Sequence, residues 1–414
     1  MLKKISTAEV ELGMYLQSME GAWLSHPFWK TKFVLQDDAD LAALRASGVP
    51  AVWIDVSKGE DVKPIALGES GPSGPSQRMP GVELALASPA LAPAATPLHT
   101  SFEDEFENAT HVLSRAKCEV MALFSEVRLG KAVDAERCLP VVDEVAATLA
   151  RNPSAFISLA RLKNRDDYTY LHSVAVCALM VGLARQLDLT EVETREAGLA
   201  GLLHDVGKMM MPLEVLNKPG SLTDAEFDVM RSHPERGFEL LKEGALVPAG
   251  ALDVCLHHHE KMDGTGYPHK LAGEQISLLA RMGAVCDVYD AITSTRPYKS
   301  AWDPAGSLQR MSQWKGQFDP AIFQAFVKSV GIYPTGTLVK LQSGRLAVVV
   351  EQSRSSLVTP RVRVFFSTKS GMPIPVQLLD LSSPTTTDRI VARESPELWG
   401  FTHVEELWNP AAKR

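Results

Sequence analysis

Hydrophobic and polar positions divide the chain into three regions with different predicted structure. Between about residues 101 and 330 the hydrophobic positions follow a helical period, and segment 175–184 is apolar nearly all round, as expected of a central buried helix. Both flanks carry shorter apolar runs that are typical of strands. The pattern therefore predicts a mainly α protein, with an all-helical domain between a small N-terminal α/β module and a C-terminal β-rich segment.

The N-terminal flank combines short strands with one helix. Strands are expected at 14–16, 33–35 and 49–56. Residues 38–47 are expected to form a helix that Gly48 ends. Segment 63–100 is rich in Pro, Ala, Ser and Gly, and it cannot bury enough apolar surface to offset its ordering entropy, which predicts a flexible linker.

The C-terminal flank begins beyond Pro334, where the helical period gives way to strand-like runs. Strands are expected at 337–341, 346–351, 362–366 and 376–381. Gly and Ser separate some of these runs, so an antiparallel sheet is predicted.

Composition limits the partners and the compartment. The net charge of −8 over 414 residues argues against non-specific binding to DNA or to an anionic membrane, so an anionic substrate needs a local basic pocket. The five cysteines include no CxxC pair, which favours a reducing cytoplasm. Glu9 and Glu11 leave no apolar signal core near the N-terminus, and no run approaches transmembrane length. A cytoplasmic location without membrane insertion is expected.

A histidine and an aspartate stand side by side where an apolar helical stretch ends. His204 and Asp205 follow residues 199–203, and Val206-Gly207-Lys208 comes next. This pair suits a two-metal centre, since the imidazole binds one ion while the carboxylate oxygens bridge both ions. Five further candidate ligands accompany the pair: His172, His233, His258, His259 and Asp287.

Each candidate also has a structural interpretation. A histidine at the start of a buried helix, such as His172, is more often a core residue than a ligand. His233 lies near the expected end of a helix opened by a capping box of Thr223 and Glu226, and it could simply complement the helix dipole. Asp287, however, lies on an apolar helix, where an unpaired carboxylate would cost several kcal/mol. Taken together, the pattern favours metal binding.

The ligand types allow an assignment to two ions. We expect one ion to be held by His172, His204, Asp205 and Asp287. Asp205 would bridge to a second ion, completed by His233, His258 and His259. Imidazole and carboxylate ligands without thiolate suit divalent Fe, Mn, Ni or Zn, and iron or manganese is favoured.

Two further motifs predict substrate contacts. Residues 263–268 read Asp-Gly-Thr-Gly-Tyr-Pro, a tight loop that would place Tyr267 near the ions to contact substrate or a partner. Arg296 and Lys299 follow Asp287 closely and are expected to bind phosphate, because an acidic protein needs this local positive charge.

These motifs, in this order, closely resemble the HD-GYP family of HD-domain phosphohydrolases over about residues 140 to 336. The resemblance implies an all-helical, metal-dependent phosphodiesterase that converts cyclic di-GMP to pGpG and often on to GMP. It places the family's metal ligands on the seven residues above and its phosphate-contacting cations on Lys208, Arg296 and Lys299. The N-terminal module, with aromatic residues between Trp23 and Phe33, looks like an accessory domain of unknown role found before some HD-GYP domains.

The sequence departs from the family at one position. Some members carry a glutamate four residues before the first histidine ligand, where it supports a third metal ion, and this chain has Tyr168 there. We therefore expect two ions and slow conversion of pGpG to GMP. In the expected mechanism a hydroxide bridging the ions attacks phosphorus, Asp205 sets the distance between the ions, and Lys208 neutralises developing charge.

Other functions remain open from the sequence. The chain could be a phosphohydrolase for another cyclic or linear dinucleotide, such as cyclic GMP-AMP. It could also be a non-catalytic cyclic-dinucleotide sensor or adaptor whose Gly-Tyr-Pro loop docks a partner such as a diguanylate cyclase. A homodimer is compatible with the sequence. The expected organisation is an accessory module at 1–62, a linker at 63–100, a helical connector at 101–140, the phosphodiesterase domain at 141–336 and the β-rich segment at 337–414.

Overall fold

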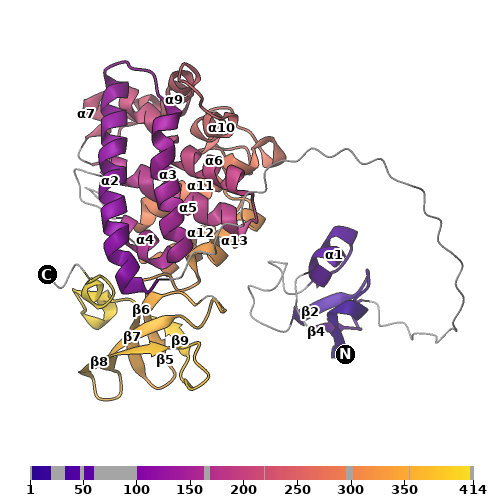
Figure 1. Ribbon diagram of the computed structural model, residues 1–414. Coiled ribbons are helices and arrows are strands. Elements are labelled where there is room, and N and C mark those ends of the chain that lie inside the picture. The colour runs from indigo at the N-terminus through magenta and orange to yellow at the C-terminus, as the bar shows by residue number, and fades with distance from the viewer. Residues whose placement is uncertain are drawn as a thin grey trace, which may run out of the picture. The chain divides into compact units, whose positions relative to one another are not determined.

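The computed structural model of the chain (Figure 1) describes most of the sequence. The described residues are 2–19, 33–46, 51–59, 100–162, 168–218, 220–294, 302–353 and 355–410. They form two compact units, which divide between Ala94 and Ala95. Most of the predicted linker and the aromatic residues from Trp23 to Trp29 lie outside the described ranges.

The N-terminal unit is a four-stranded antiparallel sheet with one helix. The strand order is β1-β4-β2-β3. The bounds are β1 Leu2–Ser6, β2 Tyr15–Met19, β3 Phe33–Val34, α1 Asp38–Ala46 and β4 Ala51–Asp55. Its small core contains Met14, Leu16 and Leu44. The expected α/β module is confirmed, although β1 was not predicted, because this five-residue edge strand contains two lysines, and Lys3 and Lys4 are exposed beside the buried Ile5.

The second unit is mainly helical, as predicted. In chain order, its first helices are α2 Phe102–Arg128, α3 Leu139–Arg151, α4 Pro153–Ala160, α5 Tyr168–Gln186 and α6 Glu191–Leu203. Those that follow are α7 Leu213–Leu216, α8 Asp224–Met230, α9 His233–Lys242, α10 Ala249–His257, α11 Leu278–Thr293, α12 Pro304–Met311 and α13 Pro320–Val330. Short 3₁₀ turns join some of them, among them η4 at Val206–Met210. Figure 1 shows α2 and α3 side by side along one side of the bundle.

Helix α5 forms the centre of this bundle. It packs against α6, α11, α13 and α2, and its residues from Leu171 to Val181 are all buried. By length and composition α5 could cross a membrane, but most of it is buried against the other helices, so core packing accounts for its apolar sequence. The prediction of a central buried helix at 175–184 is confirmed.

The C-terminal segment is an antiparallel five-stranded sheet at one end of the helical bundle (Figure 1). Its order is β8-β7-β6-β5-β9. The bounds are β5 Leu338–Leu341, β6 Arg345–Glu351, β7 Arg361–Ser367, β8 Met372–Asp380 and β9 Ile390–Arg393. Four of these strands were predicted. The edge strand β9 was not, because its four residues are too few to show an alternating pattern.

The expected helix that begins with Thr223 ends earlier than predicted. The capping box of Thr223 and Glu226 is present, but α8 ends at Met230. His233 begins the next helix, with Pro234 in its first turn, where proline is accommodated because its missing N–H would have no helical partner there. His233 therefore lies at the N-terminal end of a helix, and the suggestion that it complements a C-terminal dipole is wrong.

Candidate metal centre

Seven side chains that are dispersed over 116 positions of the sequence converge in the helical unit. His172 projects from α5, and His204 caps the C-terminus of α6 directly before Asp205. His233 begins α9, His258 caps the end of α10, and Asp287 lies in α11. Six of these side chains are buried, and His259 is partly exposed. The seven candidate ligands predicted from the sequence therefore lie together.

Their ligand atoms form two groups with Asp205 between them. In one group, potential ligand atoms of His172, His204 and Asp287 lie within 4.8 Å of one another. In the other, those of His233, His258 and His259 do so. Potential ligand atoms of His204, Asp205 and His258 also lie within 4.8 Å of one another, so Asp205 links the two groups. The two groups contain the same residues as the two ligand sets expected from the sequence, and the binding of one ion by each set stays a prediction.

The carboxylate of Asp205 faces both groups, one oxygen to each. Its Oδ2 lies 3.4 Å from His172 Nε2 and 3.2 Å from His204 Nε2. Its Oδ1 lies 3.2 Å from His233 Nε2 and 3.8 Å from His258 Nε2. This is the placement required of a carboxylate that bridges two cations.

Hydrogen bonds at the far side of each ring fix which nitrogen faces the centre. Nδ1 of His204 lies 2.8 Å from the carbonyl oxygen of Gly201, and Nδ1 of His233 lies 2.8 Å from that of Met230. Nδ1 of His258 lies 2.9 Å from the carbonyl oxygen of Val254. A carbonyl only accepts, so each Nδ1 carries a proton and donates it, and Nε2 of each ring faces the centre.

Several polar atoms converge at this centre, which fits a cation site. Nε2 of His233 and Nε2 of His258 are 3.4 Å apart. His204 Nε2 and Asp205 Oδ1 are buried and have no hydrogen-bond partner among the described residues. Unpartnered buried acceptors are costly, and a cation between them would satisfy them. The donor set of imidazoles and carboxylates suits divalent transition metals.

The buried charges influence one another strongly. Burial opposes ionisation of Asp205, but the neighbouring His204 and Lys208 hold the pKa of its carboxyl well below the usual range. Burial likewise opposes ionisation of Asp287, whereas a hydrogen bond from His172 lowers its pKa well below the usual range. Both carboxylates are therefore ionised at neutral pH and available as ligands.

The pKa values of three of the histidines are shifted in opposite directions. Burial and the neighbouring His204 lower the pKa of His258 to about 3, and burial with His258 lowers that of His259 well below its usual range. For His172, burial opposes protonation, but hydrogen bonds to Asp205 and two other carboxylates raise its pKa to about 10. Of these three candidate ligands, His172 is the one at which a proton would compete most strongly with a cation.

Asp290 supports this site, and no role was predicted for it from the sequence. Its Oδ2 lies 2.6 Å from Nδ1 of His172, one turn of α11 beyond Asp287. A carboxylate in this position orients a ligating imidazole and raises its basicity. The signal in the sequence was a second buried acidic residue three positions after Asp287 on an apolar helix.

Lys208 and Tyr267 lie at the centre, as expected. The ammonium of Lys208, on η4, is 2.5 Å from Asp205 Oδ2 and remains partly exposed. The ring of Tyr267 stacks on that of His259, with centroids 4.7 Å apart and an angle of 27° between the planes. Burial and the charge of Asp287 raise the pKa of the Tyr267 phenol, so it stays neutral and can donate a hydrogen bond.

Glu260 holds the loop that carries Tyr267, a function that was not predicted from the sequence. This buried carboxylate accepts hydrogen bonds from the backbone N–H groups of His269 at 2.7 Å and Leu271 at 3.1 Å. Gly266 makes the close approach possible, since a Cβ there would lie 2.4 Å from Cα of Glu260. The loop is therefore tied to the segment that follows the histidine ligands.

Two predicted contacts cannot be placed. Arg296 and Lys299 lie outside the described residues, so their phosphate-binding role stays a prediction. Tyr168, at the position where a third metal would need a carboxylate, stacks on the ring of His172 with centroids 5.7 Å apart.

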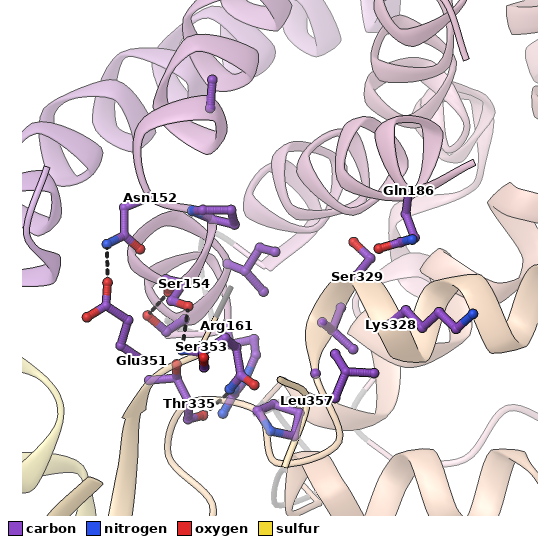
Figure 2. Close-up of a pocket in the computed structure, with 18 residues that line it drawn as sticks. Asn152, Ser154, Arg161, Gln186, Lys328, Ser329, Thr335, Glu351, Ser353 and Leu357 are labelled. Carbon is purple, nitrogen blue, oxygen red and sulfur yellow. Dashed lines mark hydrogen bonds between the residues drawn. The ribbon is translucent and has the colours of Figure 1, made fainter. Parts of the chain in front are cut away.

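A separate cavity of about 420 Å³ lies between the helical bundle and the C-terminal sheet (Figure 2). Figure 2 shows Asn152 and Glu351 joined by a hydrogen bond on one side and Lys328 and Ser329 on the other. None of the seven candidate ligands lines it. This cavity is therefore distinct from the candidate metal centre.

Comparison with known proteins gives matches over the whole chain. An HD domain matches residues 145–322, and a domain of unknown function matches residues 2–138. A cyclic di-GMP phosphodiesterase of Pseudomonas aeruginosa is 53% identical over all of this chain and 97% of its own length. The cyclic di-GMP phosphodiesterase response regulator RpfG of Xanthomonas campestris is 46% identical over 47% of this chain and 51% of its own. A 3'3'-cGAMP-specific phosphodiesterase of Vibrio cholerae is 34% identical over 40% of this chain and 32% of its own length.

Proposed function

This chain belongs to the HD-domain cyclic di-GMP phosphodiesterases, and on that basis we propose that it hydrolyses cyclic di-GMP to pGpG with two divalent cations. The observation that carries the proposal is the carboxylate of Asp205, whose two oxygens face two separate groups of ligands. When bound, two such cations would polarise the phosphate and would lower the pKa of a bound water molecule towards neutral pH. Iron or manganese suits the donor set best.

The roles of the chain's own residues follow from their positions. Asp205 fixes the separation of the two ligand groups, because each of its oxygens faces one of them. Lys208 lies beside Asp205 and would neutralise the negative charge that develops on the phosphate in the transition state. Tyr267 would donate a hydrogen bond to the substrate from its neutral phenol. Arg296 and Lys299 would hold the second phosphate and so fix the in-line geometry.

Two ions rather than three are proposed. Tyr168 offers an aromatic ring to His172 instead of a carboxylate to a third cation. With two ions we expect pGpG to accumulate before GMP forms. A non-catalytic sensor is disfavoured because it would not need buried, unpartnered acceptors such as His204 Nε2 and Asp205 Oδ1.

The remaining expectations concern location and partners. The cysteines are free and, except for Cys118, buried, which fits the reducing cytoplasm that we propose. Binding of a diguanylate cyclase through the Asp263–Pro268 loop and formation of a homodimer stay proposals that rest on the sequence.

A turnover assay tests the proposed function. The full chain, loaded anaerobically with Fe(II) or Mn(II), is expected to convert cyclic di-GMP to pGpG, followed slowly by GMP. Asp205→Ala is expected to abolish turnover while its circular dichroism spectrum stays helical. Arg296→Ala is expected to raise KM with metal content unchanged. Failure of the loaded protein to consume cyclic di-GMP, or undiminished turnover by Asp205→Ala, would contradict the proposal.

A further inference from the structure

A row of stacked side chains leads from the candidate metal centre to the protein surface. It begins where Tyr267 stacks on His259. The guanidinium carbon of Arg231 lies 4.9 Å from the centroid of the Tyr267 ring. The same carbon lies 5.8 Å from the centroid of the Phe227 ring. Phe227 belongs to α8 and Arg231 caps its C-terminus, so this short helix supplies the outer half of the row.

Packing of the core does not account for these outer residues. Helix α8 has no buried residue. Phe227 is 49% exposed, and Leu213 on α7, which packs on α8, is 53% exposed. Large exposed apolar side chains that gather beside a site are typical of a surface that contacts a ligand. Phe227 therefore presents aromatic surface at the edge of the candidate metal centre, and no described residue covers it fully.

The ion pair that Arg231 forms with a described residue is loose. Nη1 of Arg231 lies 3.9 Å from Oδ1 of Asp228, and that carboxylate is mostly exposed, so the ion pair is screened. A guanidinium has five N–H donors in one plane and binds two acceptors at once. Guanine offers such a pair of acceptors, O6 and N7, on one edge of the base.

We propose that Phe227 and Arg231 form a guanine-binding subsite for the cyclic dinucleotide whose phosphate is cleaved at the metal centre. The exposed ring of Phe227 stacks on one base, and Arg231 donates hydrogen bonds to O6 and N7 of that base. The inference rests on the proposed function, which it deepens by naming residues that select the base.

The subsite would discriminate between purines. Adenine carries an N6 amino group, a donor, where guanine carries the acceptor O6. The guanidinium of Arg231 has no acceptor, so adenine in this position would lose one hydrogen bond and place two donors face to face. Stacking on Phe227, in contrast, would be similar for both bases. Arg231 therefore contributes selectivity, and Phe227 contributes affinity.

The experiment compares Phe227→Ala and Arg231→Gln with the parent in the metal-loaded full chain. Each variant is expected to raise KM for cyclic di-GMP roughly tenfold, the scale of one lost base stack or bidentate base contact. Arg231→Gln is also expected to reduce the preference for cyclic di-GMP over cyclic di-AMP, which carries no guanine and must place adenine in the subsite. Neither variant should change turnover of bis(p-nitrophenyl) phosphate, a diester without a purine, or the number of bound ions.

Val229→Ala is the matched control, because Val229 is an exposed apolar residue of the same helix outside the row, and its KM should equal that of the parent. An unchanged KM for cyclic di-GMP in both variants would overturn the subsite. So would an equal loss of turnover on both diesters, because it would show a structural effect on His259 through Tyr267. A parent that cleaves only the generic diester would instead refute the proposed function, and the subsite with it.

Discussion

Asp290 on α11 places a carboxylate oxygen 2.6 Å from Nδ1 of His172 on α5, although 118 positions separate the two residues in the sequence. The contact turns Nε2 of His172 towards Asp205 and Asp287, at 3.4 and 3.0 Å. We therefore expect Asp290 to act on the candidate metal centre by positioning His172, without itself belonging to either group of candidate ligands.

Replacing this carboxylate tests its role. Asp290→Asn is expected to weaken metal binding about 10- to 100-fold, the usual effect of losing the partner of a ligating histidine. Chelator competition followed by metal analysis measures the change. Asp253→Asn is the matched control, because Asp253 accepts a similar contact from Nδ1 of His257, which is not a candidate ligand. Equal metal affinity of the Asp290 variant and the parent would show that the pair is only structural.

Metal binding is expected to release a proton from His172. Its pKa is raised to about 10 by neighbouring carboxylates despite burial, so the free imidazole is charged at neutral pH. Asp205 and Asp287, with lowered pKa values, have already lost their protons, and His258 and His259 are already neutral. The affinity for Mn(II) should therefore rise with pH below about 10. Titration calorimetry in buffers of different ionisation enthalpy measures the release, and pH-independent binding would contradict it.

Gly207 should not tolerate a larger residue, because backbone atoms of α9 leave no room for a Cβ atom. A Cβ there would lie 2.0 Å from the carbonyl oxygen of His233 and 2.6 Å from the backbone nitrogen of Gly237. Gly207→Ala must push α9 away from η4, and His233 moves with it. We expect a stability loss of about 1–3 kcal/mol and a lower metal content.

Gly182→Ala provides the control for this variant. Its Cβ would meet only the hydroxyl oxygen of Ser329, at 3.0 Å, and a side chain can move aside where a backbone cannot. Thermal unfolding and metal analysis of both variants give the comparison. A Gly207→Ala protein with the parent's melting temperature and metal content would show that η4 and α9 separate without consequence.

A buried ion pair joins α2 to α3 far from the metal centre. Arg151 donates from Nε and Nη2 to the two oxygens of the buried Glu105, each at 2.9 Å. Arg151→Ala leaves this carboxylate uncompensated and should cost about 3–5 kcal/mol of unfolding free energy, as measured in urea. Arg195→Ala, which breaks the exposed pair with Asp143, should cost less than about 1 kcal/mol. Equal losses in the two variants would contradict this interpretation.

The same pair sets a dependence of stability on pH. Burial opposes ionisation of Glu105, but hydrogen bonds from Arg151 and Thr100 hold its pKa below the usual value. A lowered folded-state pKa stabilises the fold above the pKa of an unfolded glutamate, roughly 4.3, and this stabilisation is lost as the pH falls through the folded-state value. The stability difference between the parent and Glu105→Gln should therefore shrink on acidification, and a constant difference would contradict the assignment.

The sequence predicted what depends on local patterns. The apolar stretch before His204, the capping box at Thr223 and the carboxylate of Asp287 on an apolar helix each carry a signal within a few residues. Positions that depend on distant segments could not be predicted in this way. The contact of Asp290 with His172 and the hold of Glu260 on the Tyr267 loop arise only when helices pack. The start of α9 at His233 was not predicted, because Pro234 allows two interpretations. A proline can follow the end of a helix, as expected from the sequence, or lie in the first turn of a new helix, as it does in the structure.

Metal stoichiometry tests the account's central claim most directly. The full chain, titrated anaerobically with Mn(II) or Fe(II) and analysed for bound metal, is predicted to hold two ions, and Asp205→Ala is predicted to hold neither tightly, because its carboxylate faces both ligand groups. A parent protein that binds no ion, or an Asp205→Ala protein that still binds two, would contradict the bridging site.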